Sequence, residues 1–176
     1  MELKESGLLY TLAGLMITFA GFSALLLTLR PAAGARLSLL DRYLAKTVMS
    51  YIFVLTAGAL LPTVLALYGP PEEWIWRASA LAFALPMLSL QATYPHRRRK
   101  AVGTGPPFPV YAVFVVLGSL VTLAMVGYVS AGFPHGSAAY ITALAVDFFT
   151  VIFGYLVALD VIMQQPLEVT DPPAQK

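Results

Sequence analysis

The chain contains no cysteine and little charge. Eleven Lys and Arg, nine Asp and Glu, and two His occur among 176 residues, so that charged residues make up 11% of the sequence, against about 25% in typical soluble domains. The absence of Cys excludes disulfides, thiolate catalysis and Cys-based metal sites. With 59% hydrophobic residues and a mean hydropathy of +0.77, the composition indicates that lipid is the main solvent.

The sequence also lacks the side-chain combinations of hydrolytic and cofactor sites. His96 and His135 both fall in predicted loops, so that Ser23, inside an apolar segment, has no His to act as its base. There is no HExxH helix and no Gly-rich phosphate loop that opens a helix after a strand. We therefore expect no enzymatic activity, no cofactor and no metal site.

Five long apolar segments fill most of the chain. Each is close to the ~20 residues that a helix needs to cross a bilayer, and backbone amides at that depth are satisfied within a helix. The polarity does not alternate as in a membrane barrel. Pro62 and Pro86 lie inside the second and third segments and should kink them. We predict an all-α polytopic membrane protein with one transmembrane domain, 1–163, and a polar cytoplasmic tail, 164–176. The predicted spans are about 8–29, 47–68, 74–94, 108–131 and 138–163.

The basic residues predict the orientation of this five-helix bundle. Short loops rich in Lys and Arg stay on the cytoplasmic side of a membrane. Such residues follow the first and third predicted spans, whereas the connections at 69–73 and 132–137 are acidic or neutral. The N-terminus should therefore lie outside and the C-terminus in the cytoplasm. The basic residues are Arg30, Arg36, Arg42 and Lys46 after the first span, and Arg97, Arg98, Arg99 and Lys100 after the third.

The second basic group adjoins a predicted membrane exit at 94–95. A basic run can indicate nucleic-acid binding, but beside a membrane exit it suits anionic lipid headgroups. We therefore expect 97–100 to orient the chain and to contact headgroups of the bilayer, with no nucleic-acid partner. Trp74 and Trp76, at the outer end of the same span, are typical of an interfacial aromatic belt.

A capping box predicts where the second helix begins. Ser38 is followed three residues later by Asp41, and this pair can satisfy two free backbone amides at a helix N-terminus. The second helix should then start near Leu39 and project into the cytoplasm before it enters the membrane.

One face of the first predicted span consists of small residues. Gly7, Gly14 and Gly21 recur every seven residues, with Thr11 and Thr18 between them. In lipid, helices associate through close packing of such faces and through hydrogen bonds between helices. This face suits packing within the chain, a subunit interface or the lining of a pore, and the sequence leaves all three open.

Asp147 is predicted to lie near the membrane midplane. A rise of 1.5 Å per residue places it in the middle of the last span, whereas Asp160 should lie near the inner interface. A central Asp costs about 2.5–3.5 kcal/mol on insertion scales, so that it should pair or hold its proton. Thr150 lies beside it, and Thr18 and Ser119 reach a similar depth.

Two interpretations of Asp147 remain open. Acids within a membrane are functional by default, so that Asp147, Thr150, Thr18 and Ser119 form a candidate site for a proton or a cation. Because no Lys, Arg or His reaches this depth, Asp147 could equally form a hydrogen bond to a hydroxyl or a carbonyl and only fix helix packing.

The segment 20–30, AGFSALLLTLR, with the basic loop that follows, resembles the first span of small bacterial multi-pass membrane proteins of uncharacterised function. The resemblance implies no activity, cofactor or site residue. We expect a location in the bacterial inner membrane. We also expect the first span to be retained rather than cleaved as a signal peptide, because residues 1–6 lack a net positive charge.

Together these features favour a membrane protein that self-associates and moves a proton or cation past Asp147. The alternative is a non-conducting subunit or scaffold, whose Gly and Thr face docks a partner membrane protein and whose Asp147 locks packing.

Overall fold

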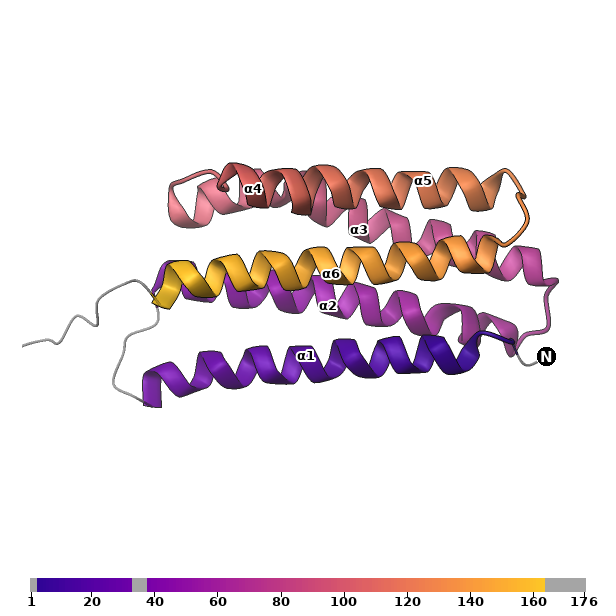
Figure 1. The fold of residues 1–176 in the computed structure, drawn as a ribbon, viewed down its shortest axis with the longest axis horizontal. Helices are drawn as coiled ribbons and strands as arrows, with labels where there is room; N and C mark the ends of the chain where they lie inside the picture. The colour runs from indigo at the N-terminus through magenta and orange to yellow at the C-terminus, as the bar shows by residue number, and fades with distance from the viewer. Residues whose placement is uncertain (1–2, 33–37, 164–176) are drawn as a thin grey trace, which may run out of the picture.

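The computed structural model describes residues 3–32 and 38–163, and all regular structure in these ranges is helical. Five long rods lie side by side and alternate in direction (Figure 1). The fourth rod combines two α-helices with a π-helical segment, η1. The elements are α1 (Ser6–Ala32), α2 (Leu39–Ala66), α3 (Glu72–Val102), α4 (Phe108–Val110), η1 (Tyr111–Leu117), α5 (Gly118–Ser130) and α6 (Gly136–Met163). The predicted tail at 164–176 lies outside the described residues.

Four of these rods are long and apolar enough to cross a membrane. Within the described ranges they are Ser6–Leu25, Leu39–Ala66, Phe108–Ser130 and Gly136–Val157. The predicted all-α class is confirmed for these ranges, and the four helices are compatible with an integral membrane protein. The remaining rod, α3, has 31 residues, but polar side chains such as Arg77 and Gln91 lower its hydropathy.

The rods differ in how many neighbours they have. α2 packs against α3 and α6, and α5 packs against the same two helices, so that α2, α3, α5 and α6 enclose the interior. α1 lies at one edge, with α2 as its main neighbour (Figure 1). A site built inside the bundle can therefore draw on α2, α3, α5 and α6, whereas α1 contributes little to it.

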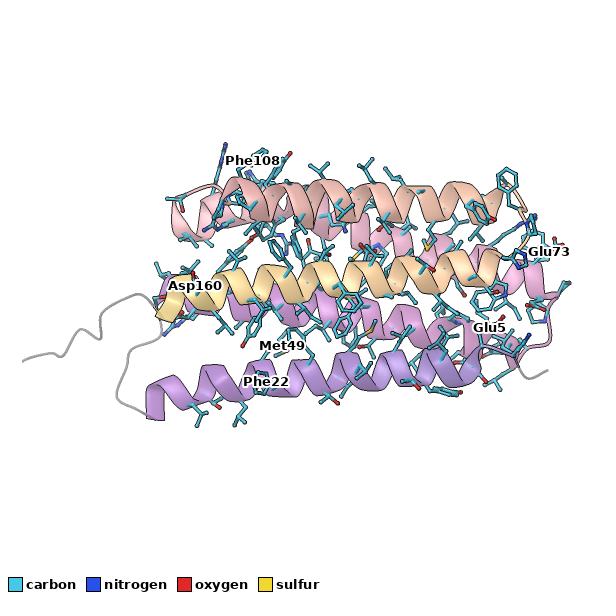
Figure 2. All side chains as sticks on the ribbon, in the orientation of Figure 1. Glu5, Phe22, Met49, Glu73, Phe108 and Asp160 are labelled. Atoms are coloured by element: carbon cyan, nitrogen blue, oxygen red, sulfur yellow. The ribbon has the colours of Figure 1, made fainter. Side chains whose placement is uncertain are left out.

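Arg42 and Lys46 of the first basic group lie at the same end of the bundle as the second group, 97–100. α2 begins where α3 ends, and the Tyr43 hydroxyl donates a hydrogen bond of 3.3 Å to the Tyr94 carbonyl across this junction. We call this the basic end, which carries Arg42, Lys46 and 97–100. Figure 2 shows Asp160 near the basic end, and Glu5 and Glu73 at the opposite end.

The prediction that His96 and the basic run 97–100 form a loop is wrong, because α3 continues to Val102. Two local interactions favour this longer helix. The Arg97 side chain donates a hydrogen bond of 2.9 Å to the Leu90 carbonyl. Gly103, with φ of 79°, then ends the helix in the left-handed conformation that glycine adopts readily.

The capping box at the start of α2 is confirmed. The amide of Asp41 donates to the Ser38 hydroxyl at 3.1 Å, and the Ser38 amide donates to the Asp41 carboxylate at 2.9 Å.

Trp74 and Trp76, near the start of α3, differ in their surroundings. Trp74 is 62% exposed, as an interfacial residue should be, whereas Trp76 is 4% exposed. The indole of Trp76 points into the bundle, where its ring lies 5.7 Å from that of Tyr140.

Pro62 leaves one carbonyl of α2 without its helical donor. Proline has no N–H, so the carbonyl four residues earlier, on Gly58, loses its usual partner. The Tyr140 hydroxyl of α6 donates to this carbonyl at 2.8 Å and thereby joins α6 to α2. Both α2 and α3 continue past Pro62 and Pro86, and the predicted kinks remain predictions.

Candidate functional site

A cluster of polar side chains, three of them buried and one partly buried, lies midway along the bundle. It consists of Gln91 from α3, Ser119 and Thr122 from α5, and Asp147 from α6. Gln91, Thr122 and Asp147 are 0% exposed. Polar groups buried among apolar helices are costly unless they bond to one another, so that their contacts determine what the cluster can do. We call these four residues the polar cluster.

Thr122 and Asp147 form the centre of the polar cluster. The Thr122 Oγ1 lies 2.9 Å from Asp147 Oδ2 and 3.0 Å from the carbonyl oxygen of Gly118. A threonine hydroxyl has one proton to donate and can also accept. An ionised Asp147 can therefore accept from Thr122, whereas a protonated Asp147 can donate to Thr122, which then donates to Gly118. The same positions of these atoms suit both charge states.

The other half of the cluster is a Gln with an unused donor. The Ser119 hydroxyl donates to Gln91 Oε1 at 3.0 Å. Within the described ranges, Gln91 Nε2 and Asp147 Oδ1 have no hydrogen-bond partner of good geometry. Both atoms lie within 3.3 Å of the point that a Cβ on Gly118 would occupy. Gly118 therefore brings the amide and the carboxyl close together, and any side chain there would separate them.

The structure brings some of the predicted site residues together and separates another. Ser119 belongs to the polar cluster. Thr150 is buried beside Asp147, but its hydroxyl donates to the Asp147 backbone carbonyl at 2.8 Å and not to the carboxyl. Thr18 is exposed on α1, where it donates to the Gly14 carbonyl at 2.8 Å. Thr18 lies on the edge helix α1, and the structure does not bring it to the polar cluster.

Gln91 and Thr122 were not among the predicted site residues. Gln91 carried a usable signal, because it is the only amide side chain in the five predicted spans, and an amide in lipid needs hydrogen-bond partners. Thr122 lies three residues after Ser119 and so shares its helical face. Neither signal shows which helices meet, because spacing along a helix does not specify the direction in which its face points.

The small face of α1 is not packed against the rest of the described chain. Gly7, Gly14 and Gly21 are exposed, and no heavy atom lies within 4 Å of a Cβ placed on any of them. Thr11 and Thr18 donate to carbonyls of their own helix, at 2.8 Å each. Of the three interpretations of this face, packing within the chain does not hold for the described residues.

Asp147 is the ionisable member of the polar cluster. No group of three or more His, Asp or Glu that could hold a metal ion occurs in residues 3–32 and 38–163. What the cluster offers is a carboxyl, two hydroxyls and an amide in contact. Such a set can accept, hold and release a proton.

No family model, no curated protein and no solved structure matches this chain.

Proposed function

We propose that this chain is an integral membrane protein of the cytoplasmic membrane that moves protons, with Asp147 as the group that carries them. The observation that supports this most directly is the polar cluster, in which Thr122 is placed to accept from or donate to the Asp147 carboxyl at 2.9 Å. Acids buried within membrane helices commonly mark proton relays.

The proposed topology has five crossings, with the N-terminus outside and the C-terminus in the cytoplasm. The crossing added to the four apolar helices is α3, the third in chain order. It is as long as its neighbours and packs between α2 and α5. The basic end would face the cytoplasm, because short connections rich in Lys and Arg are retained there. The common position of Arg42, Lys46 and 97–100 at one end supports this orientation.

A proton suits the polar cluster better than a metal cation. Calcium and similar ions need six or more oxygen ligands at distances of about 2.3–2.6 Å, whereas this cluster contains a single acid. It is also tightly packed, since a methyl group on Gly118 would lie 2.6 Å from Gln91 Nε2. A proton requires no such space, because it moves along existing hydrogen bonds.

Replacing Asp147 with Asn should abolish proton flux. Asn has nearly the same shape and can still bond to Thr122, but it cannot bind and release a proton at physiological pH. We expect liposomes that contain the wild-type protein to dissipate an imposed pH gradient, followed with an enclosed pH-sensitive dye. Liposomes that contain Asp147→Asn should behave like empty ones.

The matched control is Asp160→Asn, which makes the same chemical change at an exposed position of α6. Its proton flux should equal that of the wild type. A wild-type flux no greater than that of empty liposomes would refute the proposal, and so would an unchanged flux in Asp147→Asn.

A second candidate function is that of a self-associating subunit or scaffold, which the exposed small face of α1 favours. Gly14→Leu should then lower the oligomeric state in detergent, because the larger side chain prevents close approach of two helices. Gly127→Leu on α5 is the matched control, since Gly127 is also exposed with no heavy atom within 4 Å of its Cβ. A wild-type monomer, or equal effects of the two substitutions, would contradict self-association through α1.

A further inference from the structure

Two small cavities lie between the basic end and the polar cluster. Their volumes are about 30 and 20 Å³. The outer one reaches Arg98 and Pro107 near the basic end, and the inner one reaches Phe114 and Val151. They are adjacent, because four residues line both of them: Leu44, Tyr94, Val110 and Gly154. The cavities together therefore extend from the basic end toward the middle of the bundle.

The inner cavity ends about one helical turn from the polar cluster. Residues three or four positions apart are neighbours on the surface of a helix. Three residues of the cavity wall are spaced in this way from a residue in the polar cluster or next to it. These pairs are Tyr94 with Gln91, Phe114 with Gly118, and Val151 with Asp147. Only about one turn of each helix thus separates this space from the carboxyl of Asp147.

The walls of the inner cavity provide polar groups for water. Thr47 and Tyr155 both line it. In the described part of the chain, the buried hydroxyl of Tyr155 has no hydrogen-bond partner of good geometry, although Ser23 of α1 lies close enough to interact with it. Buried polar atoms without a protein partner commonly bond to water, and a volume above about 10–15 Å³ can hold a water molecule. Each cavity is therefore large enough for a water molecule, and the inner one has hydroxyls to bind it.

The Phe114 ring lines the inner cavity, one helical turn from Gly118 at the edge of the polar cluster. Its centroid lies 4.5 Å from that of Tyr51 and 5.1 Å from that of Tyr94, so that it is held between two aromatic side chains. Phe114 belongs to η1, and π-helical segments frequently occur at functional sites.

The other side of the cluster is packed with large apolar side chains. Leu144 precedes Asp147 by one turn of α6, and Met87 precedes Gln91 by one turn of α3. Both are 0% exposed, and Phe83 beside them is 2% exposed. The nearby Tyr140 hydroxyl is already bonded to the Gly58 carbonyl. The buried hydroxyl of Ser79, one turn before Phe83 on α3, has no hydrogen-bond partner in the described part of the chain, but the large side chains of Phe83 and Met87 lie between it and Gln91 along this helix.

We propose that, in the conformation described here, Asp147 exchanges protons with the basic end through water in these two cavities, and that the Phe114 ring is the gate, whose rotation would connect the inner cavity with Asp147. A hydrated proton entering beside Arg98 would pass along the water molecules to the carboxylate, leaving the waters in place and Asp147 neutral. The inference rests on the proposed function, because it assumes that Asp147 exchanges protons. It adds the side of access and the residue that controls it.

The absence of native Cys allows a direct test with single-cysteine variants. Val151→Cys places a thiol in the cavity wall, and Leu144→Cys places one on the same helix on the packed side of Asp147. The two positions are a matched pair, because Val151 is 1% exposed and Leu144 is 0% exposed. Silver ions in chloride-free buffer, which travel through water, should modify Val151→Cys about tenfold faster or more than Leu144→Cys.

A cavity-filling variant provides the second measurement. Gly154 lines both cavities, and Gly154→Leu should slow the reaction of Val151→Cys by blocking the way from the basic end. Both single-cysteine variants should react equally in denaturing detergent. Equal rates in the folded protein, a faster reaction of Leu144→Cys, or no effect of Gly154→Leu would overturn the proposal.

This test can fail independently of the proton-flux experiment. If Val151→Cys reacts as expected but Asp147→Asn leaves the flux unchanged, the water path stands and the transport function is refuted. If the flux depends on Asp147 but Val151→Cys is unreactive, the function stands and access from the basic end is refuted.

Discussion

Gly58→Ala is expected to lower the free energy of unfolding by about 2–3 kcal/mol, near the upper end for overpacking of a core. A Cβ at this position would lie 2.5 Å from Cδ2 of Phe83 and 3.2 Å from Cδ2 of Leu144. Both side chains are buried, and the Phe83 ring also packs against Tyr140. The ring cannot move aside without disturbing this contact, so α2 itself would have to shift.

The effect can be measured by unfolding the protein reversibly with SDS in mixed micelles and following the loss of helix by circular dichroism. Gly127→Ala is the control, because no atom lies within 4 Å of its Cβ. It should change the free energy of unfolding by less than about 0.5 kcal/mol, as surface substitutions usually do. The variant Gly58→Ala with Phe83→Leu should recover part of the loss. Similar stabilities of Gly58→Ala and Gly127→Ala would contradict the close contact of α2 and α3.

Gly118→Ala is expected to cost about 1–3 kcal/mol and to reduce proton flux as well. The new methyl group would lie 2.6 Å from Gln91 Nε2 and 3.3 Å from Asp147 Oδ1. Gln91 is the more flexible side chain, so it should move and weaken its hydrogen bond with Ser119. Unlike Gly58→Ala, this substitution acts directly on the polar cluster.

A double-mutant cycle with Gln91→Ala separates this explanation from a general loss of packing. If the cost of Gly118→Ala comes from the collision with Gln91, it should be much smaller in the Gln91→Ala background, because neighbouring substitutions that share a contact are not additive. The same unfolding assay and the flux assay provide both readouts. Additive losses of stability would show that the methyl group collides with something other than Gln91.

Much of the helical architecture could be predicted from the sequence. The lengths of the apolar runs, about 20 residues each, predicted the five rods, and the pair Ser38 and Asp41 predicted the start of α2. The end of α3 was harder. Pro95 and the basic run 97–100 are typical of a loop, but hydropathy reports where a chain leaves lipid and not where a helix ends. In α3, helical hydrogen bonding continues to Val102.

The candidate site could be predicted only in part. Counting residues along a span estimates depth, and depth identified Asp147 and Ser119. It also selected Thr18, which has a suitable depth but lies on the edge helix α1. Depth does not specify the rotation of a helix or its neighbours, and these depend on packing between residues far apart in the sequence. Gln91 and Thr122 became evident only when α3, α5 and α6 were placed together.

The hydrogen bond between Tyr140 and the Gly58 carbonyl also has a consequence for biogenesis. The two residues are 82 positions apart. At a synthesis rate of about 5–20 residues per second, α2 would emerge from the ribosome about 4–16 s before its partner on α6. During this interval the Gly58 carbonyl lacks both its helical donor and its tyrosine, and an unsatisfied carbonyl is costly in lipid. A nascent chain without α6 therefore carries a defect within the bilayer, which arrival of the last helix repairs.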